Sequence, residues 1–232
     1  MADLEMGRDR SDGEEVEGGK INPSLLDLKH LHYLDLSGNY FGRIRIPSFI
    51  GSIGSLRYLN LSNAGFSGAI PHQLGNLTMM RYLDLSSNHF EGIRIPSFIG
   101  PIGSLRCLGL SNAGFSGAIP YQLGNLTMMR YLGLHRNLGM FLGSEFQLRG
   151  DNLHWVSGLL LLQHLDMSLV NLSKSLDWVE VISTLPSLVE LQLRGCDFNI
   201  LLLQLPLTLH HYISSTFLIA ILHRLYLGGF IV

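Results

Sequence analysis

The pattern Leu-x-x-Leu-x-Leu recurs along this chain every 24 to 26 residues, apart from one interval of 33. Its seven copies begin at Leu31, Leu56, Met80, Leu105, Met129, Leu162 and Leu188. Apolar residues at alternate positions match the period of a β-strand, so each copy predicts a short strand with one buried face. A fixed repeat period in this range predicts a solenoid, in which each coil buries its apolar side chains against its neighbours.

The repeats therefore predict an α/β solenoid of the leucine-rich-repeat type. We expect a horseshoe with a parallel sheet of about seven strands on its concave face and short turns or 3-10 segments on its convex face. The 24–25-residue repeat length and the Gly-x-Ile-Pro sequences at 68–71 and 117–120 resemble those of the plant type of leucine-rich repeat. Related Ile-Pro pairs occur at 46–47 and 95–96, and Gly and Pro favour the bends of a return limb.

Three residues after the last leucine of each motif comes a turn position. It holds Asn39, Ala64, Asn88, Ala113, Asn137, Val170 and Cys196. An Asn there can bond backbone groups that would otherwise be buried without partners. In the Ala coils we expect water, or neighbours such as Asn63 and Asn112, to take this role.

Phenylalanine recurs two positions further on, at Phe41, Phe66, Phe90, Phe115 and Phe198. We interpret this column as an aromatic spine stacked inside the solenoid. An aromatic binding site is the alternative.

A longer period lies above the repeat. Residues 44–88 align with residues 93–137 at a constant offset of 49, and only positions 52, 58, 60, 72, 84, 86 and 87 differ from their partners. Two coils were copied together, which a solenoid tolerates because each coil contacts only its neighbours.

The chain divides into three parts by composition. Residues 1–18 are acidic, lack the basic start and apolar core of a signal peptide, and are expected to be disordered. Residues 19–199 form the repeat domain, with an insertion at about 138–158 that is either a binding loop or a passive surface loop. Residues 200–232 are an apolar tail, expected to lie on the last coil; a membrane span is the alternative.

Several function classes find no support in the sequence. The net charge of −2 gives no sign of a nucleic-acid partner. Two cysteines, Cys107 and Cys196, cannot form a disulfide framework, and we expect neither to be a nucleophile. No zinc-protease, phosphate-loop or nucleophile-elbow motif occurs, and the pair His210-His211 has no further ligands at a suitable spacing. We therefore expect no enzyme activity, no cofactor and no metal.

The outward positions of the predicted strands form three columns. One holds Arg57, Arg81, Arg106 and Arg130, the next Tyr33, Tyr58, Tyr82, Cys107, Tyr131 and His164, and the third Asp35, Asn60, Asp84, Gly109, Gly133 and Asp166. Tyr and Arg are enriched at binding hot spots. The predicted ligand-binding residues are Arg57, Tyr58, Arg81, Tyr82, Asp84, Arg106, Arg130 and Tyr131. The alternative is that Arg stacks on Tyr while Asp balances its charge, which would only keep the sheet soluble.

Asn-x-Ser/Thr sequons begin at Asn60, Asn76, Asn125 and Asn171. A glycan on Asn60 would obstruct the concave face. We expect Asn76 and Asn125 to be the better acceptors in a secreted chain.

Two stretches carry a family resemblance: GKINPSLLDLKHLHYLDLSGNYF with the IPSFIGSIGSLRYLNLSNAGFSGAIPHQLGNLT that follows, and NLHWVSGLLLLQHLDMSLVNLSKSLDWVEVISTLPSLVELQLRGC. They resemble the ectodomain of plant leucine-rich-repeat receptor-like proteins, in the class of the fungal-xylanase and fungal-resistance receptors. That resemblance implies a glycoprotein of defence signalling, at the plasma membrane or outside the cell, with a co-receptor kinase as partner. It implies a membrane anchor for a full-length relative, and we expect this chain to match the middle of such an ectodomain.

The sequence thus predicts a module that recognises a peptide, protein or glycan on its concave face. A soluble inhibitor of a microbial wall-degrading enzyme, or a truncated receptor fragment without function, are the alternatives.

Overall fold

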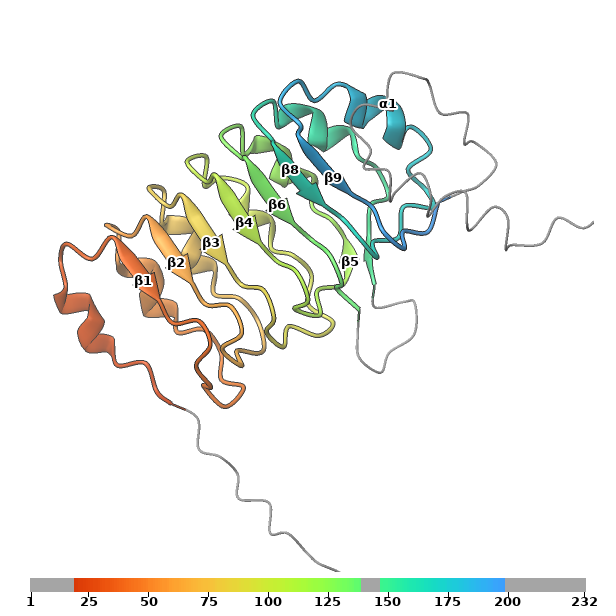
Figure 1. Cartoon of the computed structure of the whole chain (residues 1–232). Helices are drawn as coiled ribbons and strands as arrows, with labels where there is room; N and C mark the ends of the chain where they lie inside the picture. Colours follow the sequence, from red (N-terminus) through yellow and green to blue (C-terminus); the bar gives the residue numbers. More distant parts are fainter. Residues whose placement is uncertain (1–18, 139–146, 199–232) are drawn as a thin grey trace, which may run out of the picture.

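A seven-stranded parallel sheet runs the length of the solenoid in the computed structural model, which describes residues 19–138 and 147–198 (Figure 1). Its order is β1-β2-β3-β4-β6-β8-β9, so strands that follow one another along the solenoid also pair. The strands are β1 (Tyr33–Asp35), β2 (Tyr58–Asn60), β3 (Tyr82–Asp84), β4 (Cys107–Gly109), β6 (Tyr131–Gly133), β8 (His164–Asp166) and β9 (Glu190–Gln192). The predicted leucine-rich-repeat solenoid is confirmed. The segments 1–18 and 200–232 lie outside the described residues.

The register of the sheet follows the leucine pattern. The central residues of the seven strands are cross-strand partners, and all are at most 9% exposed: Leu34, Leu59, Leu83, Leu108, Leu132, Leu165 and Leu191. A slip of one residue would turn this row out to solvent, so burial of the leucines fixes the register.

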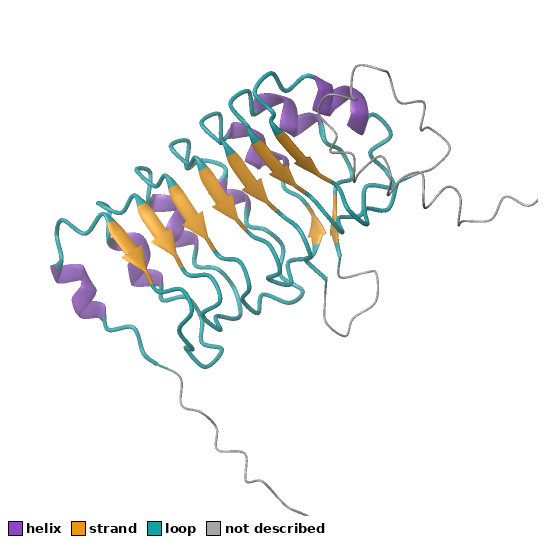
Figure 2. Ribbon diagram, in the orientation of Figure 1, coloured by secondary structure: helices purple, strands orange, loops and turns teal. Residues whose placement is uncertain are grey.

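Short helices cover the opposite side of the coils (Figure 2). Within residues 19–138 and 147–198 the 3-10 helices are η1 (Pro23–Asp27), η2 (Ser48–Ser52), η3 (His72–Asn76), η4 (Ser97–Ile99), η5 (Tyr121–Asn125) and η7 (His154–Gly158). The last described coil has one turn and a half of α-helix instead, α1 (Trp178–Ser183). A proline stands immediately before η2, η3, η4 and η5 and fixes extended backbone there. No helix in residues 19–138 and 147–198 combines the length and hydropathy that a membrane crossing needs.

Glycines let these helices stack closely. A side chain at Gly124 would place its Cβ 2.5 Å from the carbonyl oxygen of Trp155 in the next coil. Gly51 and Gly100 lie in the same way against the carbonyls of Gln73 and Gln122. Because the close neighbour is backbone, it cannot move aside as a flexible side chain could.

A second, two-stranded sheet forms beside the return limb. It pairs β5 (Gly117–Ala118) with β7 (Leu148–Arg149), and isolated bridges extend it from Arg149 to Asn171 and from Asn171 to Asp197. Within the insertion expected at about 138–158, the described residues 147–158 form β7 and the helix η7. Sequence reasoning missed these pairings because two-residue strands leave no periodicity to read.

The phenylalanine column lies inside the solenoid. Phe66, Phe90 and Phe115 are fully buried, and Phe41 is 7% exposed. Phe41 stacks on Phe66 at 5.0 Å between ring centroids, and Phe90 stacks on Phe115 at 5.2 Å. Phe198 is only partly buried and packs at 4.8 Å against Trp178 of α1. The column is thus core packing, and the alternative of an aromatic binding site does not hold for its four buried members.

The turn of each Ala coil is held by the asparagine of the following coil. Asn88 Oδ1 accepts hydrogen bonds from the backbone N–H groups of Ala64 at 3.3 Å and Phe66 at 2.9 Å. Its Nδ2 donates to the carbonyls of Leu61 at 2.8 Å and Leu85 at 2.9 Å. One buried amide therefore joins two coils and supplies hydrogen-bond partners to backbone groups of both.

Asn137 repeats this arrangement one double coil later. Its Oδ1 accepts from the N–H groups of Ala113 and Phe115, and its Nδ2 donates to Leu110 and Leu134. The expectation that Asn63 and Asn112 would serve the Ala coils was wrong. Both are exposed, with left-handed φ values of 49° and 52° that turn their side chains away from the buried groups.

The turn positions of the first and last described coils, Asn39 and Cys196, lack the four-bond arrangement of Asn88 and Asn137. Asn39 is exposed and bonds only carbonyls of its own coil, Leu36 and Ser37. Buried Cys196 lies with its Sγ 3.1 Å from the carbonyl oxygen of Met167 in the preceding coil, in the place that an Asn amide takes elsewhere. A thiol is a weak donor, so this coil has a weaker link.

We predict that Asn88→Ala lowers the free energy of unfolding by about 2–4 kcal/mol, because it leaves several buried backbone groups without partners at roughly 1–3 kcal/mol each. Asn39→Ala, the same change at the exposed turn, should cost less than about 1 kcal/mol. Urea unfolding of the full chain followed by circular dichroism measures both. Equal losses for the two variants would contradict the role assigned to the buried amide.

We also predict that Gly124→Ala destabilises the chain by about 1–3 kcal/mol, since the new methyl group must force two backbone segments apart. Gly103→Ala is the matched control, because a Cβ there meets nothing within 4 Å. The two melting temperatures should separate clearly; coincidence of the two would show that the helices have room to move.

Candidate functional site

An ordered row of arginines lies along the edge at which the strands of the sheet begin. Arg57, Arg81, Arg106 and Arg130 each stand one residue before a strand, and the backbone itself aligns them. The N–H of Arg81 donates to the carbonyl of Arg57 at 2.7 Å, and the same bond joins each later pair at 2.8 and 2.7 Å. The four side chains therefore project from one line across neighbouring strands, which stand about 4.8 Å apart.

These arginines are not neutralised within the described part of the chain. None of the four makes a salt bridge within residues 19–138 and 147–198, although Asp84 lies only three residues after Arg81. Arg57, Arg81 and Arg130 are exposed, and Arg106 is half-buried. The row, which we call the arginine row, is a line of free positive charge.

The tyrosines beside the row stack on one another. Tyr33 and Tyr58 lie 4.0 Å apart between ring centroids with planes 10° from parallel, and Tyr58 and Tyr82 lie 4.2 Å apart at 11°. Both faces of the Tyr58 ring are thus covered by tyrosine. One alternative from the sequence required an arginine to stack on the neighbouring tyrosine, and at Tyr58 this does not occur. The three rings form a continuous aromatic wall, the tyrosine stack.

The acidic column is engaged by its own coil. Asp84 accepts hydrogen bonds from the Tyr82 hydroxyl at 3.3 Å and the Ser86 N–H at 2.9 Å. Asp35 makes the equivalent bonds with Tyr33 and Ser37. These carboxylates hold the tyrosines and the turn, so they do not balance the arginine row.

Glycine in the next strand makes room for this arrangement. A Cβ at Gly109 would lie 2.5 Å from Asp84 Oδ1. The matching position in the copied coil is Asn60. The coil of β2 therefore carries a side chain at this place, and the coil of β4 does not.

The environment of the tyrosines disfavours their ionised form. The hydrogen bond with the Tyr58 hydroxyl raises the pKa of Tyr33 to about 12, with smaller contributions from burial and from Asp35. Burial, and then the nearby Asp84 carboxylate, raises the pKa of Tyr82 as well. Burial also raises the pKa of Tyr131. Burial raises the pKa of the Cys107 thiol too, and the positive charges of Arg106 and Arg130 lower that pKa by a smaller amount. Cys107 is thus protonated at neutral pH, as an unreactive thiol is.

Beyond Cys107 the face changes character. Tyr131 and His164 are tilted rings 6.4 Å apart, and His164 Nδ1 lies 3.0 Å from Glu190 Oε2. His135 Nδ1 lies 2.9 Å from Asp166 Oδ2. Sequence reasoning did not find these pairs. The available signal was a difference between the copied coils, since His135 stands at the position that corresponds to Ser86. The structure thus brings the arginines and tyrosines of β2 and β3 together and leaves Tyr131 at the start of a histidine-carboxylate region.

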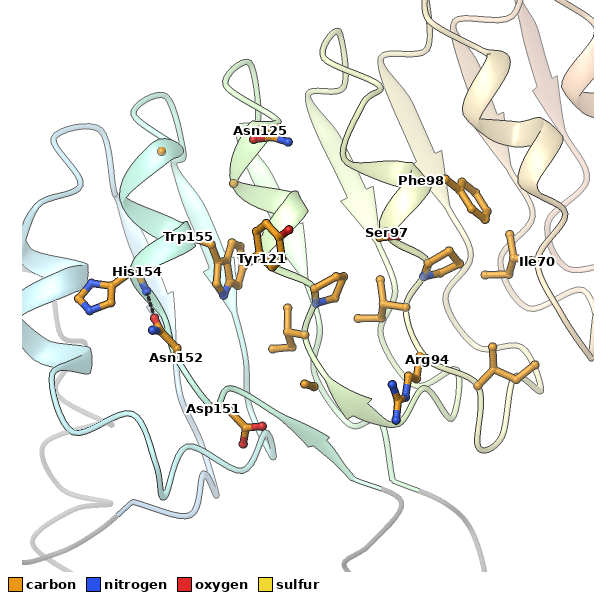
Figure 3. Close-up of a pocket in the computed structure, with 18 of the residues that line it drawn as sticks. Ile70, Arg94, Ser97, Phe98, Tyr121, Asn125, Asp151, Asn152, His154 and Trp155 are labelled. Atoms are coloured by element: carbon orange, nitrogen blue, oxygen red, sulfur yellow. Dashed lines mark hydrogen bonds between the residues drawn. The ribbon is translucent and has the colours of Figure 1, made fainter.

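A separate hollow of about 1160 Å³ lies on the side of the return limb (Figure 3). Its walls combine the Ile-Pro limb with η5 and η7, and Tyr121 and Trp155 lie near each other there. Tyr121 is 73% exposed, and the buried Trp155 Nε1 has no hydrogen-bond partner. One sequence difference marks this hollow: Tyr121 stands where the copied coil has His72. None of the predicted ligand-binding residues lines this hollow.

The sequons lie in different settings. Asn76 and Asn125 are exposed at the ends of η3 and η5. Asn60 is half-buried in β2 and accepts from the Ser62 N–H, and Asn171 accepts from the Ser173 N–H and hydroxyl. Their glycosylation stays a prediction. Among the residues that the structure describes, no group of three His, Cys, Asp or Glu could hold a metal ion.

Comparison with known proteins settles the family. The sequence profile described as "Leucine-rich repeat region" matches residues 15–144. The chain belongs to the leucine-rich repeat family. This leucine-rich repeat chain is also 62% identical over 60 residues to Receptor-like protein EIX1 of Solanum lycopersicum, a match that covers 26% of the chain and 6% of that protein. The expected resemblance to plant receptor-like proteins is confirmed.

Solved structures agree with this assignment. The ectodomain of the Arabidopsis thaliana receptor kinase GASSHO1/SCHENGEN3, in complex with CASPARIAN STRIP INTEGRITY FACTOR 2, matches with a TM-score of 0.62 and 26% identity. That match covers 76% of this chain and 20% of the other. The peptide hormone receptor RGFR1 in complex with RGF2 matches with a TM-score of 0.65 and 27% identity, over 78% of this chain and 27% of the other. The chain therefore has the repeat architecture of plant receptor ectodomains, and the receptor-like proteins that it resembles form a non-enzymatic class.

We predict that the concave face makes the protein less stable in alkali. Because the folded state raises the pKa of Tyr33 from about 10 to about 12, the unfolded chain releases that proton first. Stability from this group is full below pH ~10 and is lost as the pH rises toward ~12.

Urea unfolding at a series of pH values between about 9 and 12 tests this, with Tyr33→Phe as the comparison. The phenylalanine variant keeps a ring to stack but cannot ionise, so its stability should fall less steeply. Parallel curves for the two proteins would contradict the assignment.

Proposed function

We propose that this chain is a recognition module that binds a peptide or an extended protein segment on its concave face. The observation that carries this proposal is the juxtaposition of an unneutralised arginine row and a tyrosine stack on one rigid sheet. The residues that would contact the ligand are Arg57, Tyr58, Arg81, Tyr82, Asp84, Arg106, Arg130 and Tyr131. Arg and Tyr dominate binding energy at interfaces because each combines a large contact area with hydrogen-bonding groups.

Pre-organisation supports the same function. Tyr82 is held between Tyr58 and Asp84, by stacking on one side and a 3.3 Å hydrogen bond on the other. A side chain fixed in this way loses little conformational entropy when a ligand arrives. The backbone ladder likewise fixes the origin of each arginine.

The similar ectodomains support a peptide or protein ligand, since the peptide hormone receptor RGFR1 was solved in complex with RGF2 and GASSHO1/SCHENGEN3 in complex with CASPARIAN STRIP INTEGRITY FACTOR 2. By the same likeness we propose a place at the plasma membrane or outside the cell, and a co-receptor kinase as signalling partner. The chain spans 6% of the length of its tomato relative, so these roles would belong to a longer architecture.

The test selects peptides from a random display library on the full chain and measures their affinity for three variants. Arg81→Ala and Tyr82→Ala should each weaken binding by about 10-fold or more, which corresponds to about 1.4 kcal/mol. Tyr121→Ala, a change of an exposed tyrosine on the other side of the solenoid, should leave affinity within about 2-fold.

Circular dichroism must first show that all three variants remain folded. Peptides that bind both concave-face variants as well as the parent, or that lose affinity only with Tyr121→Ala, would place recognition elsewhere and overturn the proposal.

A further inference from the structure

The arginine row has an electrostatic cost that the fold does not require. Like charges on directly opposed strand positions are destabilising, and here four such charges follow one another about 4.8 Å apart. The matching positions in the flanking coils are His32, Gln163 and Val189, so the coil tolerates neutral residues at this place. The row is confined to the coils of β2, β3, β4 and β6.

The opposite edge of the same face is acidic. Asp84 stands three residues beyond Arg81, about 10 Å along the strand, and Asp35 and Asp166 hold the same position in the two coils that flank the row. The other three coils of the row have neutral residues there, Asn60, Gly109 and Gly133. The three carboxylates are taken up by Ser37, Ser86 and Ser168, and they also bond tyrosine or approach His135. The face is therefore polarised, with free positive charge on one edge and engaged negative charge on the other.

We propose that the ligand of this face is an acidic polypeptide segment, bound extended across the strands with its carboxylates toward the arginine row. This inference rests on the proposed recognition function and names the chemistry of the ligand. Guanidinium groups bind carboxylates through two parallel N–H···O bonds, so each arginine is suited to such a partner. The acidic edge repels the same carboxylates and so sets which side of the segment faces which edge.

The dimensions fit a short stretch of chain. Four arginines span three strand intervals, or about 14 Å. An extended peptide advances about 3.3 Å per residue, so roughly five residues cover the row. Alternate side chains of such a segment face the same way about 6.6 Å apart, which flexible arginine side chains can meet. The tyrosine stack then lies under the backbone and the remaining side chains.

The experiment uses the full chain and a fluorescent peptide of about seven residues that alternates Glu and Ser, long enough to overhang the row at both ends. The same peptide with Gln in place of Glu is the neutral probe. The Glu peptide should bind at low salt at least about 10-fold more tightly than the Gln peptide. Its affinity should fall as salt rises, because exposed ion pairs are screened.

The decisive variant is Arg81→Glu with Arg106→Glu. It should weaken Glu-peptide binding by about 10-fold or more and flatten the salt dependence. Arg45→Glu with Arg94→Glu is the matched control, since both arginines are exposed outside the row and the net charge changes equally. It should stay within about 2-fold of the parent protein. If the charge-reversed protein fails to fold, Arg81→Gln with Arg106→Gln takes its place.

Three outcomes would overturn the inference: equal binding of the Glu and Gln peptides, equal losses in the two double variants, or a short oligothymidylate that binds as tightly as the Glu peptide. The last would indicate unselective attraction of polyanions. Library peptides that are neutral, insensitive to salt and still lost in Tyr82→Ala would sink the acidic ligand while leaving concave-face recognition intact.

Discussion

The buried amide of Asn88, with its copy at Asn137, is the interaction on which the solenoid depends. A coil of this kind turns sharply after its strand and leaves backbone donors and acceptors in an apolar interior, where each unpaired group costs about 1–3 kcal/mol. The amide supplies an acceptor to two N–H groups and a donor to two carbonyls, across two coils at once. Each of the two Ala coils of this chain is followed by an Asn coil whose amide bonds its turn. The copied double coil of residues 44–88 and 93–137 contains one Ala turn and the Asn that bonds it, so each copy carries this pair complete.

Two further constraints keep the coils in a fixed relation. On one side the leucine row holds the strands in register, and on the other the glycines of the short helices allow backbone to lie against backbone. Between them the phenylalanines fill the interior. Because all three act from coil to neighbouring coil, any outward strand position is repeated along a straight line. Four arginines at one position of the repeat thus form a row, and three tyrosines at another form a stack. The core does not require these side chains to touch one another.

This geometry gives a recognition surface its character. The side chains that face solvent are not part of the leucine and phenylalanine core, so they can differ from coil to coil, as Tyr58 and Cys107 or Asp84 and Gly133 do between the copies. The tyrosine stack ends where Cys107 interrupts it, and the histidine-carboxylate pairs begin beyond that point. The concave face therefore has an aromatic and cationic half and a second half of different chemistry, both carried by one uniform scaffold.

The sequence by itself determined the solenoid, the seven strands, their register and the columns of outward residues, because each follows from a local period and from the burial of leucine. It also placed the phenylalanines inside. It did not determine which groups would pair between coils: the bonds from Asn88 to the preceding Ala coil, the tyrosine-on-tyrosine stacking, the engagement of Asp84 by Tyr82 and Ser86, and the short pairing of β5 with β7. These depend on distances and orientations between residues some 22 to 27 positions apart in the chain, or on hydrogen bonds that have no period. The repeat fixes which residues meet, and only the packed coils decide which of them bond and which, like the arginine row, make no salt bridge within the described residues.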